Sequence, residues 1–277
     1  MCRPLGMAAG LALHAGSARC ARLEAQHVTN KIVTRLCETN SILVVNDRFP
    51  GQTIHVRKGD TVFVNVYNYG DMQLTLHWHG VKQPRNPWSD GPEYVTQCPI
   101  QPGNNFTYEV IFSSEEGTVW WHAHSDWTRN TVHGPIVVHP AEGTTSPYPQ
   151  PDAEEIIILE TCLPQMHTQS MANLEISIIA LKDASYLKPV VTSYIMIGPG
   201  QTMNVLVTAN QSLGQYYMAA HQYYTTDIAT FDGYDKTNVT AILQYNGDYK
   251  PPTTPYYPTS MLPPSRTTTP ELASGTS

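Results

Sequence analysis

Two pairs of histidines in this chain have the spacing of a metal site. His77 and His79 form one H-x-H motif, and His122 and His124 form a second. Residues two positions apart in a β-strand point to the same face, so each motif places two imidazoles side by side. On neighbouring strands of one sheet, the four imidazoles would converge on one cavity. Neutral imidazole binds copper, zinc, iron and nickel, and an all-histidine redox site without thiolate ligands favours copper.

The alternative is that these histidines lie on the surface or in the core and bind no metal. A single H-x-H motif fits that alternative well, whereas two motifs flanked by Trp78, Trp120 and Trp121 favour a metal site. Other histidines lack convergent partners at this spacing and are expected to have structural or surface roles. They are His55, His133, His139, His167 and His221.

The elements that position the two motifs are predicted to be strands. Short apolar, β-branched runs alternate with Asn-Asp, Pro-Gly and Lys-Gly-Asp turns. The predicted strands are 41–45, 52–56, 61–66, 73–78, 106–110, 118–122 and 136–138. Seven or more short strands within roughly 110 residues, with almost no helical periodicity, predict an all-β fold, a Greek-key sandwich or barrel.

The second half of the chain has weaker patterns. Further strands are predicted at 155–159, 194–197, 203–207, 216–220 and 239–245, and a short helix within 165–181. The last thirty or so residues are rich in Pro, Thr and Ser and are expected to be disordered. The expected organisation is a signal peptide at 1–25, a first domain at 26–140, a linker at 141–154, a smaller second domain at 155–247 and a tail at 248–277.

The charge balance limits the classes of partner. Lys and Arg number 16 and Asp and Glu number 23, giving a net charge of −7. An acidic chain with no basic run is a poor candidate for binding nucleic acid or an anionic membrane, and weakly favours a small neutral or cationic partner. No run of about 18 apolar residues occurs, so no transmembrane helix is expected.

The N-terminus and three sequons predict a secreted glycoprotein. A small-residue apolar run follows Arg3 and is typical of a signal peptide cleaved between Ala18 and Ala25; the alternative is a disordered or wrongly assigned N-terminus. N-x-S/T sequons at Asn105, Asn210 and Asn238 agree with secretion. The five cysteines include no C-x-x-C motif, which argues against a zinc ribbon or a thioredoxin-type site.

The sequence around the histidines resembles plant laccases, which are copper-dependent multicopper oxidases. The resemblance covers nearly all of 31–140, resumes in the second half, and implies cupredoxin-like domains of which the first is complete and the second partial. The segments that carry it are TRLC at 34–37, VN at 45–46, FPG at 49–51, HWHG at 77–80, WSDGP at 88–92, YVTQCPI at 94–100, GTVWWHAH at 117–124, DASYLKP at 183–189 and GPGQTMNVLVTAN at 198–210.

The resemblance implies a role for each matching residue. His77 would bind the type-2 copper of a trinuclear cluster, and His79, His122 and His124 would bind the type-3 pair. Asp90 would relay protons during dioxygen reduction; the alternative is a turn aspartate before Gly-Pro. These roles are chemically consistent, because reducing dioxygen to water needs several electrons, hence several coppers, and protons, hence a nearby carboxyl.

Part of the laccase pattern does not occur in this sequence. The third cupredoxin domain of the family carries H-P-x-H-L-H-G and H-C-H-x-x-x-H motifs, and neither is present. By resemblance, the chain has four cluster ligands and no type-1 copper site, where substrate electrons enter. Cys37 and Cys98 would pair with cysteines in the missing parts, while Cys162 has no counterpart and is expected to be a free buried thiol.

Two functions follow from these features. The first is laccase-type oxidation of phenols, lignin-related in the family, with reduction of dioxygen to water in the apoplast. The second is a non-catalytic copper-binding protein, arising as a remnant, a splice form or an incomplete gene model. In a third arrangement, a separate chain supplies the missing four histidines. The incomplete second domain would expose core faces and unpaired strand edges.

Overall fold

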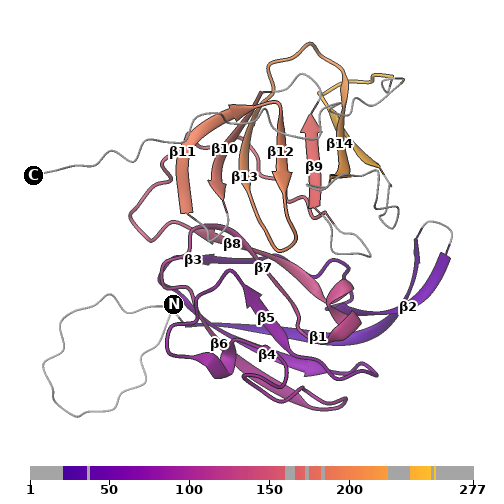
Figure 1. Cartoon of the computed structure of the whole chain (residues 1–277), viewed down its shortest axis with the longest axis vertical. Coiled ribbons are helices and arrows are strands. Elements are labelled where there is room, and N and C mark those ends of the chain that lie inside the picture. Colours follow the sequence, from indigo (N-terminus) through magenta and orange to yellow (C-terminus); the bar gives the residue numbers. More distant parts are fainter. Residues whose placement is uncertain are drawn as a thin grey trace, which may run out of the picture.

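The computed structural model describes residues 21–35, 38–159, 166–171, 175–181, 185–223, 238–250 and 253. These residues form fifteen strands in four sheets and two short 3₁₀ helices, η1 (Pro87–Ser89) and η2 (Asp126–Asn130), so the predicted all-β class is confirmed (Figure 1). Neither helix in this part of the chain is long or apolar enough to cross a bilayer.

Strands β1 to β8 form a sandwich of two sheets, called the first sandwich below. One sheet has the order β2-β1-β4-β6 and the other β3-β8-β7-β5. The bounds are β1 (Ala21–Arg35), β2 (Glu38–Val45), β3 (Ile54–Arg57), β4 (Thr61–Asn68), β5 (Leu76–His79), β6 (Asn105–Ile111), β7 (Gly117–Ala123) and β8 (His133–His139). Side chains from both sheets form one buried apolar cluster, which lies between them as period-two alternation requires.

Two tryptophans anchor the middle of this core. Trp78 and Trp121 are fully buried and face each other across the antiparallel β5–β7 pair. Trp121 is accommodated by two glycines, since a Cβ at Gly51 or Gly134 would lie 2.5 Å from its ring. The packing of these rings against backbone holds β5 and β7, the strands that carry the histidine motifs.

Strand β1 was not predicted, since the first strand expected from the sequence is 41–45. It pairs in parallel with β4 from Ala21 opposite Thr61 to Val28 opposite Asn68. Residues 21–25 of the expected signal peptide therefore belong to a strand, while residues 1–20 lie outside the described part. The segment 21–27 lacks a strong β pattern, and its pairing comes from the β4 edge.

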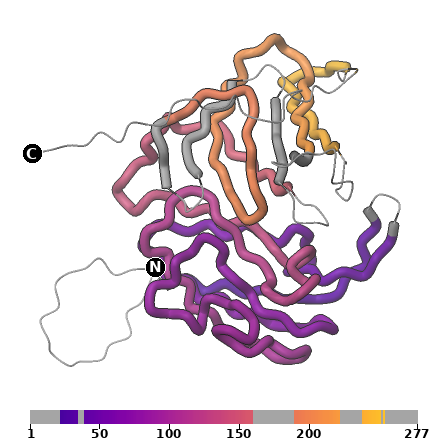
Figure 2. Tube along the Cα trace, viewed as in Figure 1, coloured from indigo at the N-terminus to yellow at the C-terminus, as the bar shows by residue number. Residues whose placement is uncertain are grey.

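Strands β9 to β15 form the remaining two sheets, called the second unit below, with the orders β11-β10-β13 and β12-β9-β14-β15. In Figure 2 the coloured parts of this unit, orange and yellow, lie beside the indigo-to-magenta first sandwich. The bounds are β9 (Met166–Met171), β10 (Glu175–Leu181), β11 (Ser185–Thr192), β12 (Tyr194–Ile197), β13 (Asn204–Thr208), β14 (Gln215–Tyr223) and β15 (Val239–Gln244).

Two local predictions in the second half were wrong. The helix expected within 165–181 is replaced by β9 and β10. Strand β10 has antiparallel partners on both sides, and its β-branched residues are suited to such a central strand. The strand expected at 155–159 is irregular backbone. That segment instead runs beside β3 and β8, where Ile156 and Ile158 line a cavity.

The apolar packing of the second unit is sparse in its described residues. Ile195 is buried, and Met203, Val205, Val207, Met218 and Leu243 pack against it while partly exposed. On the edge strands β11 and β15, Val191 and Val239 are mostly exposed. The domain boundaries given above stay a prediction. Of the expected tail, only 248–250 and 253 are described.

Candidate metal centre

The two histidine motifs lie on neighbouring strands. Strands β5 and β7 pair antiparallel, with His77 opposite His122 and His79 opposite Trp120. Burial alternates along β5, so Leu76 and Trp78 face the core and the two histidines face outward. The imidazoles therefore gather on the outer face of the β3-β8-β7-β5 sheet, here called the histidine face.

Three of the four imidazoles form a compact group. One ligand atom from each of His77, His79 and His122 lies within 4.8 Å of the others, and this is the one such group among the described residues. The ring centroid of His77 is 5.7 Å from that of His79 and 5.4 Å from that of His122. Three converging imidazoles and no carboxylate or thiolate form a donor set that suits copper.

His124 lies at the open edge of the same face. Its ring centroid is 5.5 Å from that of His77 and 5.9 Å from that of His122, and its side chain is exposed. It follows the end of β7, and its backbone N–H donates to the Thr75 carbonyl at 3.0 Å. The structure thus brings all four predicted histidines together but leaves His124 accessible from outside.

Hydrogen bonds decide which ring nitrogens are available. Nδ1 of His77 lies 2.7 Å from the Asp90 carbonyl oxygen, and Nδ1 of His122 lies 2.8 Å from the Ala123 carbonyl oxygen. A carbonyl can only accept, so in both rings Nδ1 carries the proton and Nε2 is left with a lone pair for a metal. These contacts therefore set the tautomer in the way metal-ligating histidines require.

The electrostatics of the face favour neutral imidazole. The pKa of His122 is lowered from 6.5 to about 3, mainly by burial and also by the neighbouring His77, His79 and His124, while the hydrogen bond to Ala123 acts in the opposite direction. The protonated imidazole is poorly solvated at a buried position and is repelled by any neighbouring imidazolium group, so the neutral form is favoured. His122 can therefore bind a cation over a wide pH range without first releasing a proton.

Asp90 is held next to His77 by a close backbone crossing. It follows η1, and its Oδ1 lies 3.5 Å from Nδ1 of His77 with the carboxylate 28% exposed. At Gly91, φ is +98° and a Cβ would lie 1.8 Å from the Leu76 carbonyl oxygen, so only glycine fits against β5. The Asp90 N–H also donates to the Pro87 carbonyl, so Asp90 is both a turn residue and a neighbour of the site.

Sequence patterns did not indicate the groups that cover the histidine face. The Trp120 ring stacks on His122 at 4.3 Å between centroids and lies 5.1 Å from His79. Its place in β7, two residues before His122, was the available signal. From the second unit, the β12–β13 turn reaches the same face (Figure 1): the Thr202 hydroxyl donates to the Thr118 carbonyl at 2.6 Å, and the Asn204 side chain accepts from the Thr118 N–H.

The other histidines of the first sandwich do not belong to the group of ligand atoms. His139 and His133 lie on β8, with His133 opposite His122, and His55 lies on β3. Cys98 is a free, exposed thiol, and its expected pairing with a cysteine of the missing parts stays a prediction. Cys37 and Cys162 lie outside the described residues, as do the first two cysteines. The sequon residues Asn105, Asn210 and Asn238 are all exposed.

Comparison with family models gives two matches. Residues 27–143 and residues 150–248 each match a model described as multicopper oxidase. The two matches together cover most of the chain, and the first contains the entire histidine face.

Several plant proteins are similar to this chain. It is 42% identical to putative laccase-9 of Oryza sativa subsp. japonica, over 79% of this chain and 48% of the relative. It is 39% identical to laccase-14 of Arabidopsis thaliana, over 80% of this chain and 49% of the relative. The chain therefore spans about half the length of the curated relatives it matches.

Solved structures give the fold. Fet3p, a multicopper oxidase that functions in iron import, superposes with a TM-score of 0.71 at 19% identity, over 86% of this chain and 55% of its own. A laccase from Botrytis aclada gives 0.68 at 22% identity, over 86% and 56%. These likenesses confirm the predicted cupredoxin-like Greek-key fold.

Proposed function

The chain belongs to the multicopper oxidase family, and we propose that its histidine face is half of the trinuclear copper cluster of a laccase-type oxidase. One observation carries this proposal: three imidazole ligand atoms within 4.8 Å of one another, in the segment that matches the family model. In this proposal His77 holds the type-2 copper, and His79, His122 and His124 hold type-3 copper. Bound copper would supply the electrons for reducing dioxygen to water. Phenolic substrates would return these electrons to the copper.

The chain's own residues orient the ligands and supply protons. The Asp90 carbonyl accepts from Nδ1 of His77 and so leaves its Nε2 for the metal, and Trp120 stacks on His122 and shields it from water. The Asp90 carboxylate lies beside His77 and is partly exposed, so it can take a proton from solvent and deliver it near the metals. A positioned carboxyl of this kind is what a reaction consuming protons needs.

The open side of the histidine face suggests where the remaining ligands approach. Large apolar side chains close to the site in sequence are exposed: Trp88 in η1, two residues before Asp90, is 61% exposed, Trp127 in η2, three residues after His124, is 73% exposed, and Tyr94 and Val95 are also exposed. Exposed aromatic groups in segments next to an incomplete site favour a surface that other protein covers. We propose that this protein, from a longer form of the chain or from a partner chain, completes the cluster and contributes the type-1 copper.

Secretion is part of the same proposal. The three exposed sequon asparagines are accessible to glycosylation, which takes place on secreted chains. The acidic net charge of −7 and the absence of a basic run agree with small phenols, lignin-related by family, rather than nucleic acid as the partner.

Copper loading of the purified chain tests the proposal. We expect bound copper with the electron paramagnetic resonance signal of a type-2 ion, no intense blue absorption, and no turnover of a phenolic dye by this chain alone. His122→Ala should lose copper, whereas His133→Ala, at the equally buried histidine opposite it on β8, should keep it. Failure of the chain to bind copper, or equal loss in both variants, would overturn the assignment.

A further inference from the structure

A second pair of histidines lies at another part of the same sheet. Strands β3 and β8 pair in parallel, which places Arg57 beside His139 and His55 beside Val137. Nδ1 of His55 is 3.3 Å from Nε2 of His139, and the two rings are within 15° of parallel. Neither residue belongs to the ligand group of the histidine face.

We propose that His55 and His139, together with the carboxylate of Glu154, bind a divalent transition-metal ion such as Zn²⁺. Two imidazole nitrogens bound to a tetrahedral ion at about 2.0–2.1 Å are about 3.3–3.4 Å apart. The observed separation of 3.3 Å matches this distance. On binding, the hydrogen bond between the two rings is replaced by one bond from each nitrogen to the ion, after a modest rotation of each ring about its soft terminal torsion.

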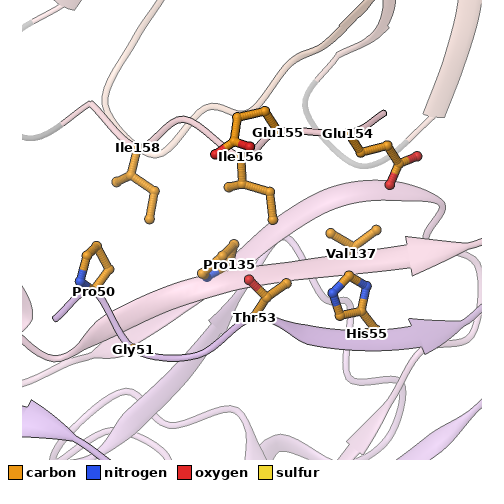
Figure 3. A pocket seen from close by; sticks show the side chains of 10 residues that line it. All are labelled: Pro50, Gly51, Thr53, His55, Pro135, Val137, Glu154, Glu155, Ile156 and Ile158. Atoms are coloured by element: carbon orange, nitrogen blue, oxygen red, sulfur yellow. The ribbon is translucent and has the colours of Figure 1, made fainter. Parts of the chain in front are cut away.

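The third donor comes from the irregular segment that follows the first sandwich. Glu154 and His55 line the same cavity of about 470 Å³, and Figure 3 shows them at the same end of it, with Pro50 and Ile158 at the other. Glu154 is exposed and lies outside regular structure, so its carboxylate is free to turn toward the histidines. The cavity leaves room for the water that completes a four-coordinate ion.

The surroundings of His139 also favour its neutral form. Burial lowers the pKa of His139, His55 and Arg57 lower it further, and Glu154 raises it. Glu154 is therefore close enough to His139 to act on it, and its negative charge would offset that of the ion. The Arg57 guanidinium opposes a cation, but its Nη1 donates to the Pro140 carbonyl at 3.2 Å, which restrains it.

Equilibrium dialysis of the full chain against Zn²⁺ measures the number of zinc ions bound, and the difference between wild type and variants gives the occupancy of this site. We expect wild type to bind one more zinc than the His55→Ala, His139→Ala double variant. Glu154→Gln should lower the affinity for that zinc by about tenfold or more. Removing even an outer hydrogen-bond partner of a metal ligand lowers metal affinity by about this factor. His27→Ala and Glu142→Gln are controls at exposed residues outside the cavity, and should bind zinc like wild type.

The imidazoles of the histidine face are also suited to zinc, so their contribution must be separated. A His79→Ala, His122→Ala variant should keep the zinc that depends on His55. In the unmutated chain, ¹⁵N spectra should show Nδ1 of His55 and Nε2 of His139 shifting when zinc is added, which requires no variant to fold. Equal zinc stoichiometry in wild type and the His55, His139 double variant, or unmoved ring resonances, would overturn the proposal.

Discussion

Gly200 of the second unit lies directly against the imidazole of His79 in the first sandwich. A Cβ built on Gly200 would be 3.0 Å from both Cε1 and Nε2 of that ring, and the glycine itself has φ of +74°. A residue with a side chain fits neither this backbone conformation nor this contact. The β12–β13 turn therefore restrains a proposed copper ligand from across the boundary between the two parts of the chain.

Replacing this glycine should disturb the copper site more than the fold. Gly200→Ala is expected to lower the free energy of unfolding by about 1–2 kcal/mol, the usual cost of a positive φ without glycine. It should also displace His79 and change the copper signal in electron paramagnetic resonance. Gly143→Ala is the matched control, since φ is +78° there and no atom lies within 4 Å of the added Cβ. A copper signal altered equally in both variants would contradict the contact.

Asp90→Asn should separate proton supply from copper binding. The substitution keeps the backbone carbonyl that orients His77, so the copper content should stay as in wild type. The amide cannot deliver a proton as the carboxyl does, so dioxygen uptake by the reduced, copper-loaded protein, measured in the form that completes the cluster, should slow by about 10²-fold or more. Asp126→Asn, at the start of η2, is the control. Loss of copper in the Asp90 variant would instead point to a purely structural role.

The copper-free chain should lose stability in mildly acidic solution. His122 has a folded-state pKa of about 3 against an ordinary value of 6.5. Between these two values the unfolded chain binds a proton at this position that the folded chain does not, so the free energy of unfolding falls as the pH is lowered. Urea unfolding above pH 6.5, and at several points between 3 and 6.5, measures this slope. His122→Gln should flatten it; unchanged curves would exclude burial of His122 as its source.

Limited proteolysis should divide the chain into parts of unequal resistance. The first sandwich has one continuous buried core, whereas apolar packing in the described residues of the second unit is sparse. We expect a stable fragment that ends between Pro140 and Pro151, because exposed, loosely packed segments are cleaved first. Mass spectrometry of the fragments identifies the end. Equal survival of both parts would show that the second unit is better packed than its exposed edges indicate.

Much of the first sandwich could be predicted because strand alternation is local. The apolar residues of 61–66 alternate in the sequence and alternate in burial in β4. Residues 165–181 and 155–159 were predicted wrongly for a different reason. β10 acquires its strand conformation from partners on both sides, and 155–159 runs beside β3 and β8 without pairing with either of them.

The sequence alone determined that each H-x-H motif presents two imidazoles on one face, since period two follows from the backbone of a single strand. Only the tertiary structure decided that His77 lies opposite His122, that His124 stays at the open edge, and that Gly200 closes on His79. These relations depend on which strands become neighbours and in what register. Long-range packing sets both, and no local pattern in the chain encodes them.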